Sequence, residues 1–97
     1  MFDRSPRHTK IEKELATSFG VVVLEHPVGY ARDESNLYCV SNDGKIIWFA
    51  ELPEANALYT RVKFDDLGEK LLTYSTRGHA CDIDLRTGKL LKKVSIS

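Results

Sequence analysis

The sequence lacks most of the features that would point directly to a function. Only two of its 97 residues are cysteine, too few for a disulfide framework. No apolar run approaches the roughly 18 residues that span a membrane, and no apolar segment follows the polar N-terminus as in a secretory signal. Basic and acidic residues balance at 14 each, without the basic excess that nucleic-acid or anionic-membrane binding needs. We therefore expect a cytoplasmic protein with neither type of partner.

The charges that are present are unevenly distributed. Residues 25–69 contain nine acidic and four basic residues, a net charge of −5, whereas residues 70–97 contain six basic and two acidic residues, a net charge of +4. With 42% hydrophobic and 29% charged residues, the composition is that of an ordinary soluble domain. We expect residues 1–97 to form one domain that has an acidic middle and a basic end.

Recognisable catalytic or metal-binding motifs are also missing. The three histidines are widely spaced; His79 and Cys81 share one face of an expected strand, but no nearby residue completes a zinc set. We expect both to pack inward. Asp82 and Asp84 share the opposite face, where binding backbone groups or solvent is a more ordinary role than acid–base catalysis. The sequence predicts no catalytic residue, no metal and no cofactor.

What the sequence does contain is a repeat. The segment Leu37–Ile47 returns at residues 80–91, each time as an alternating strand, a turn that ends in Gly-Lys, and a second apolar strand. The offset is 43 residues before the turn and 44 after it, because the second turn is one residue longer. Repeats of about 40–50 residues that contain several short strands are typical of β-propeller blades.

Strand and turn patterns extend this repeat into two units, residues 20–52 and 53–97. Alternation, β-branched residues and turn residues predict four antiparallel strands in each unit: 20–26, 29–32, 37–41 and 45–51, then 59–64, 69–75, 79–85 and 89–96. We therefore expect an all-β fold of two four-stranded antiparallel, propeller-like blades. Residues 1–19 are assigned to an N-terminal arm or helix. Thr9 and Glu12 fit a capping box, and the spacing of Ile11, Leu15 and Phe19 favours a short helix over 9–18.

The segments 37–48 and 82–91 resemble the last hairpin of quinoprotein-type β-propeller repeats. Trp48 matches the tryptophan that ends this pattern, whereas the second unit has Lys92 there; Ser41 replaces an aspartate that the second unit keeps as Asp84. The resemblance covers about residues 20–97 and implies the blade fold. Quinoprotein enzymes bind their cofactor at the axis of a closed ring of blades, and two blades make no such ring, so no cofactor-binding residue is carried over.

In size and layout the chain is similar to half-propeller immunity proteins of contact-dependent growth inhibition systems. These proteins neutralise a cognate toxin domain, often a nuclease, and the resemblance implies an acidic surface that covers a basic one. It leads to our first hypothesis, a non-catalytic protein-binding module that acts by occlusion. Its expected contact residues are acidic or aromatic: Glu51, Glu54, Asp65, Asp66, Glu69, Trp48 and Phe49.

The second hypothesis is a small enzyme or ligand-binding subunit. Its site would contain His79, Asp82 and Asp84 and would be completed by dimerisation. Because two blades leave sheet edges uncovered, both hypotheses include pairing with a partner or with a second copy, most simply as a homodimer. Residues 20–26 and 89–96 are the expected open edges, and Lys92 and Lys93 could instead protect the last one.

Overall fold

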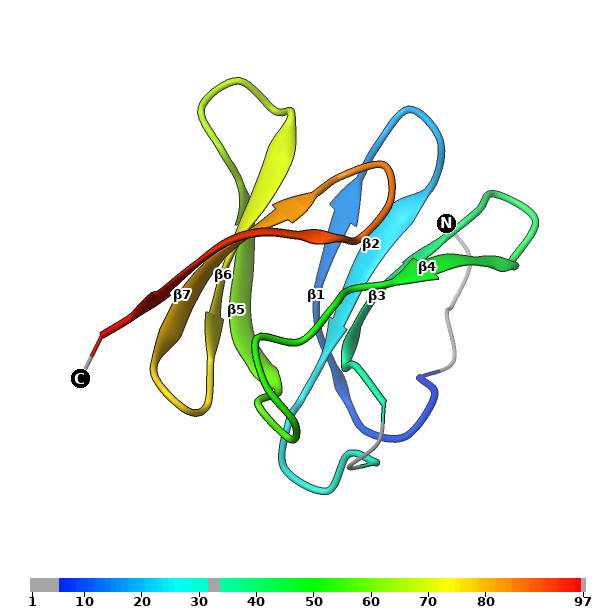
Figure 1. Ribbon diagram of the computed structural model, residues 1–97. Coiled ribbons are helices and arrows are strands. Elements are labelled where there is room, and N and C mark those ends of the chain that lie inside the picture. Colours follow the sequence, from blue (N-terminus) through cyan, green and yellow to red (C-terminus); the bar gives the residue numbers. More distant parts are fainter. Residues whose placement is uncertain (1–5, 32–33, 97) are drawn as a thin grey trace.

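A computed structural model describes residues 6–31 and 34–96 of the chain, and within them every regular element is a β-strand. Figure 1 shows two antiparallel four-stranded sheets, with strand orders β1-β2-β3-β4 and β5-β6-β7-β8. This confirms the expected all-β fold. The strands are β1 (Ile11–Ala16), β2 (Val21–Glu25), β3 (Leu37–Val40), β4 (Ile46–Phe49), β5 (Tyr59–Phe64), β6 (Lys70–Ser75), β7 (His79–Asp84) and β8 (Leu90–Ser95).

Three expectations for the first unit are wrong. The segment expected to be a helix over 9–18 forms β1, so the first sheet begins within the part assigned to the N-terminal arm. Residues 29–31 lie in the loop between β2 and β3 instead of in a strand, while Arg32 lies outside the described residues. Because β1 pairs with β2, residues 20–26 are not an open edge. The described part of the chain contains no helix that could cross a membrane.

The two sheets repeat each other down to their irregularities. In the first sheet the pairing register shifts between Ile11 and Lys13 and again between Cys39 and Val40. In the second sheet the register shifts at the corresponding places, between Tyr59 and Arg61 and between Asp82 and Ile83. Bulges redirect the side chains that follow them. The sheets therefore share one pattern of faces, with offsets of 48 residues for β1 and β5 and 43 residues for β3 and β7.

The sheets stack front to back. In β3, Leu37 and Cys39 face the common core, whereas in β7 the core residues are Cys81 and Ile83, the counterparts of Tyr38 and Val40. Opposite faces of the repeat thus meet at the interface. As a result, the outer faces of the two sheets correspond to opposite faces of the repeat and differ from each other.

The outer face of the second sheet is polar where its counterpart in the first sheet is core. Leu15, Cys39 and Trp48 pack in or against the core, and their register counterparts in the second sheet are Lys63, Asp82 and Lys92. Polar residues on an outward face allow a stack of repeats to end in water. The outer face of the first sheet instead keeps an apolar cluster of Val23, Tyr38 and Val40.

The segment before β1 lies against this apolar outer face. The backbone N–H groups of Arg7, His8 and Thr9 donate to the carboxylate of Glu25 at 2.6, 2.9 and 2.9 Å, and the Tyr38 hydroxyl donates to the same carboxylate. Glu25 is fully buried. Burial raises its pKa, but these four donors outweigh that effect and hold the pKa of Glu25 below its ordinary value. A charged carboxylate thus anchors the segment.

Candidate functional site

A groove of about 780 Å³ lies at the end of the molecule where three turns meet. The turns connect β1 to β2, β5 to β6, and β7 to β8, and they bring together residues from both sheets. The groove is lined by Ala16, Thr17, Ser18, Phe19, Phe64, Asp65, Asp66, Leu67, Gly68, Glu69, Asp84, Leu85 and Arg86. Three of the acidic residues expected to contact a partner, Asp65, Asp66 and Glu69, are among them.

The groove combines acidic groups with an apolar anchor. Four carboxylates and the single cation of Arg86 line it, so its lining carries net negative charge. Leu67, at the tip of the β5–β6 turn, is 77% exposed. An exposed apolar side chain can become buried when a partner binds, and carboxylates around it favour a basic partner.

The carboxylates in the groove differ in what they bind. Asp65 accepts the backbone N–H groups of Glu69 and Lys70 at 2.8 and 3.1 Å and so stabilises the turn. Slight desolvation raises its pKa, but these N–H groups and the charge of Lys70 more than compensate and keep that pKa below its usual value. Asp84 accepts the N–H of Arg86 and the hydroxyl of Thr87, both at 3.0 Å.

Asp66 and Glu69 differ from these two residues. Both are exposed, and neither carboxylate has a hydrogen-bond or ion-pair partner among the described residues. The carboxylates of Asp66 and Glu69 are therefore available to a partner without the loss of a hydrogen bond or ion pair among the described residues.

Glu51 and Glu54 do not belong to this groove. The Glu51 carboxylate accepts the N–H of Leu90 at 2.8 Å and ties the chain after β4 to β8. Glu54 lies near the opposite end of β6, where it contacts Nε2 of His79 at 2.9 Å. The acidic residues between 51 and 69 thus divide into a groove set and a set that joins parts of the fold.

Trp48 and Phe49 lie on opposite faces of β4. Trp48 is buried between the sheets, and its indole N–H donates to the carbonyl of Leu85 at 3.0 Å, so it joins the sheets and is closed to a partner. Phe49 is 40% exposed, packs against Tyr38 and has the Arg7 guanidinium 5.0 Å from its ring centroid. Of the two expected aromatic contacts, Phe49 alone offers surface.

Exposed apolar side chains gather on the two outer edge strands. Each sheet ends in an edge strand that is also its last strand in sequence: β4 in the first sheet and β8 in the second, green and red in Figure 1. Six large apolar side chains between 38% and 58% exposed lie on these strands or directly after β8: Ile46, Ile47, Phe49, Leu91, Val94 and Ile96. β8 confirms the open edge expected over 89–96, and Phe49 was an expected contact, whereas the exposure of Ile46 and Ile47 on β4 was not expected.

The three residues of the enzyme hypothesis do not come together. His79 is buried on the core side of β7, whereas Asp82 and Asp84 lie on the other side, and Asp82 forms an ion pair with Lys70 at 2.9 Å. His79 instead lies between Ser75 and Glu54, with Nδ1 2.9 Å from the Ser75 hydroxyl.

Ser75, His79 and Glu54 are the residue types of a hydrolase triad, but here they stabilise the β6–β7 turn. Ser75 is 1% exposed, so no substrate reaches its oxygen. That oxygen accepts the N–H groups of Arg77 and His79, at 3.2 and 3.1 Å, which leaves the hydroxyl hydrogen for Nδ1 of His79. A nucleophile needs an accessible oxygen, and this one closes the β6–β7 turn instead.

Neither the cysteines nor the acidic residues form a metal centre within the described residues. No group of three or more histidine, cysteine, aspartate or glutamate side chains is placed to hold an ion there. Cys39 and Cys81 are both buried, and burial raises the pKa of each thiol. Both therefore pack as small apolar side chains.

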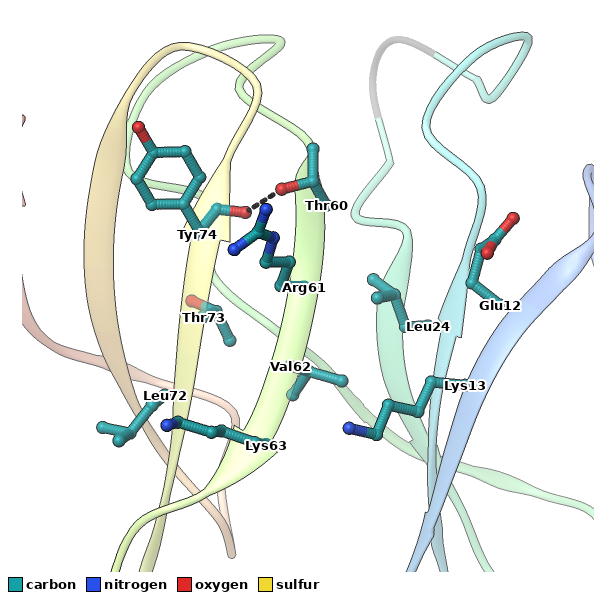
Figure 2. A pocket seen from close by; sticks show the side chains of 10 residues that line it. All are labelled: Glu12, Lys13, Leu24, Thr60, Arg61, Val62, Lys63, Leu72, Thr73 and Tyr74. Carbon is teal, nitrogen blue, oxygen red and sulfur yellow. Dashed lines mark hydrogen bonds between the residues drawn. The ribbon is translucent and has the colours of Figure 1, made fainter. Parts of the chain in front are cut away.

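A second, smaller pocket of about 440 Å³ opens between the two sheets, lined by residues of β1 and β2 on one side and of β5 and β6 on the other. Figure 2 shows the Lys13 side chain reaching toward β5, while Arg61 and Lys63 extend from β5 over β6. The sequence analysis missed this pocket. A usable signal was present in the sequence. If residues 11–16 are treated as a strand, the 48-residue offset between β1 and β5 makes Lys13 the counterpart of Arg61.

The comparison with protein families adds one finding. Residues 8–94 match the family described as "Domain of unknown function (DUF7957)". The chain belongs to this family. No curated protein matches it. The DUF7957 match runs from the segment before β1 into β8, so the unit that this family describes contains both sheets and all three turns of the acidic groove.

Proposed function

We propose that this DUF7957 chain is a non-catalytic protein-binding module that uses the acidic groove to cover a basic surface of its partner. The observation that carries the proposal is the groove itself, where the unengaged carboxylates of Asp66 and Glu69 flank the 77% exposed Leu67. Carboxylates at the rim steer a basic partner, and an apolar side chain at the centre loses contact with water on binding.

In its specific form, the proposal is that the chain is an immunity protein that binds a cognate toxin domain, such as a nuclease, and neutralises it by occlusion. Two observations support it. The front-to-back stacking of the sheets agrees with the half-propeller layout on which the resemblance rests, and the groove gathers three of the nine acidic residues between 25 and 69 on one surface. A nuclease that binds phosphates presents a basic surface of the kind this groove would complement.

Self-association is a separate part of the proposal. β4 and β8 are edge strands with exposed apolar side chains, and edges of this kind favour pairing with another strand. We propose a homodimer through one of these edges, whose exposed apolar residues are not among those that line the groove. The β4 edge is the better candidate. Charged side chains oppose strand pairing, and β8 carries Lys92 and Lys93, whereas β4 has no charged residue between 46 and 49.

Co-expression with the product of the adjacent gene tests the proposed function. If that product arrests growth, the wild-type chain should restore it, and a Leu67→Ser, Asp66→Asn, Glu69→Gln variant should fail while remaining folded. The matched control, Glu12→Gln with Glu54→Gln, removes two carboxylates outside the groove and should protect fully. Equal protection by the groove variant, or no complex with the adjacent product, would contradict the proposal.

A further inference from the structure

The pocket where β1 and β2 face β5 and β6 gathers positive charge that the fold does not neutralise. Lys13, Arg61 and Lys63 line it, and none of the three has a carboxylate within ion-pair distance in the described part of the chain. Lys70, on the same outer face as Lys63, is different: it lies 2.9 Å from Asp82, and that contact raises its pKa. The pocket cations are therefore in excess.

The only acidic residue in the pocket lining does not offset them. Figure 2 shows the Glu12 carboxylate pointing away from β5, whereas the ammonium group of Lys13 points toward it. Two of the four basic residues within the acidic stretch 25–69 are Arg61 and Lys63. The fold thus separates the charges of one hairpin, placing cations along β5 and carboxylates in the turn that follows.

The rest of the lining is apolar or aromatic. Leu24, Val62 and Leu72 form apolar walls, and the Tyr74 ring lies on the outer face of β6 beside the Arg61 side chain. A pocket of about 440 Å³ is within the size range of small-molecule sites. Its lining therefore suits a ligand that has an anionic end and a flat, weakly polar end.

We infer that this pocket binds a small organic phosphate, with the phosphate at the cations and a ring against Tyr74. A phosphate dianion matches the uncompensated charge of these three cations better than a single carboxylate would. The planar guanidinium of Arg61 can give two parallel hydrogen bonds to phosphate oxygens, and Lys13 and Lys63 add point charges. An aromatic side chain stacks on a nucleobase without needing a particular base.

Titration calorimetry with adenosine monophosphate, adenosine and inorganic phosphate tests this inference on the full chain. Adenosine monophosphate should bind most tightly, and its affinity should fall about tenfold or more in Arg61→Gln with Lys63→Gln, because charge-assisted contacts are lost. Tyr74→Leu should weaken adenosine monophosphate but leave inorganic phosphate unchanged. The matched control, Lys45→Gln with Lys89→Gln, removes the same charge at two hairpin turns and should bind like wild type.

Several results would overturn the inference. They are the absence of adenosine monophosphate binding at millimolar concentration, an affinity for adenosine or inorganic phosphate equal to that for adenosine monophosphate, and an equal loss in the control variant. All variants change exposed or half-buried side chains, and circular dichroism confirms that each is folded before binding is compared. Because none of these residues lines the acidic groove, failure here leaves the proposed protein-binding function untouched.

Discussion

The side chain of Asn36 makes both hydrogen bonds of a strand pair with the backbone of Tyr59. Its Nδ2 donates to the Tyr59 carbonyl at 2.7 Å, and its Oδ1 accepts the Tyr59 N–H at 2.8 Å. The same Nδ2 also donates to the carbonyl of Glu25 at 2.7 Å. Asn36 is fully buried between β2 and the start of β5. One amide therefore fixes the first sheet to the second, which makes the pair a single structural unit.

Replacing Asn36 should weaken the connection between the two sheets and lower the free energy of unfolding. Asn36→Ala leaves the Tyr59 N–H and two carbonyl groups without partners in a buried place, so we expect the free energy of unfolding to fall by about 3 kcal/mol. Urea denaturation followed by Trp48 fluorescence measures this loss. Asn42→Ala, in the exposed β3–β4 turn, is the control and should change stability by less than about 0.5 kcal/mol. Similar losses in both variants would contradict the role of Asn36.

The contact between Gly88 and Trp48 provides a second test. Gly88 has a φ of +74°, and a Cβ atom there would lie 2.6 Å from the Trp48 ring. Gly44, at φ +86°, occupies the corresponding turn of the first sheet with nothing within 4 Å of such an atom.

Comparing alanine substitutions at these two glycines separates the clash from backbone strain. Gly44→Ala should cost about 1 kcal/mol from the left-handed backbone alone. Gly88→Ala should cost at least about 1 kcal/mol more, since Trp48 must move, and should shift its fluorescence to longer wavelength. Thermal unfolding together with emission spectra distinguishes the variants. Identical behaviour of the two would show that the indole is not tightly packed against the turn.

Glu25 makes stability depend on pH in a defined direction. Its pKa in the folded chain lies below the ordinary value of 4.5, so its contribution is fully present above that value and is lost as the pH falls through the lower, folded pKa. Glu25→Gln should cost about 2 kcal/mol near pH 7. The difference between wild type and variant should shrink below pH 4.5. Denaturation between pH 3 and 7 checks it; a constant difference would mean that the carboxylate charge is unimportant.

Both thiols should react only when the core opens. Cys39 and Cys81 are 0% and 2% exposed, and burial raises the pKa of each. Labelling with a thiol reagent at pH 8 should therefore be slow for both and should accelerate with denaturant, in parallel with unfolding. Mass spectrometry counts the labels. Rapid labelling of one cysteine in native buffer would show that this part of the core opens locally.

The sequence predicts the strands of the second unit well and those of the first only in part. The main reason is a bulge in β1. Gly-Lys turns between apolar or alternating segments mark β3, β4, β7 and β8. Ile11 and Leu15, four residues apart, imitate a helix face, but the bulge between Ile11 and Lys13 turns them to opposite faces of β1. Thr9, which fits a helix cap, instead donates its hydroxyl to the carbonyl of His26 at 2.6 Å. A bulge has no reliable sequence signal, so the strand was mistaken for a helix.

The same limit applies to the candidate site. The carboxylates of Asp65, Asp66 and Glu69 are close in sequence, so any hairpin places them together. Phe19 and Asp84, which complete the groove, lie in turns whose proximity depends on how the two sheets stack. The front-to-back arrangement decides which face of each repeat is buried, and no single strand pattern contains that information.

The central claim, that the acidic groove recruits a basic partner, is tested most directly by the salt dependence of association. Stopped-flow or surface-based measurement would follow binding of the adjacent gene's product to wild type, to Asp66→Asn with Glu69→Gln, and to the control Glu12→Gln with Glu54→Gln. We predict that the groove variant associates about tenfold more slowly than wild type at low salt, and that the gap closes by about 0.5 M salt, because screening removes steering. Association rates and salt slopes that are the same for the groove variant and the control would contradict the claim.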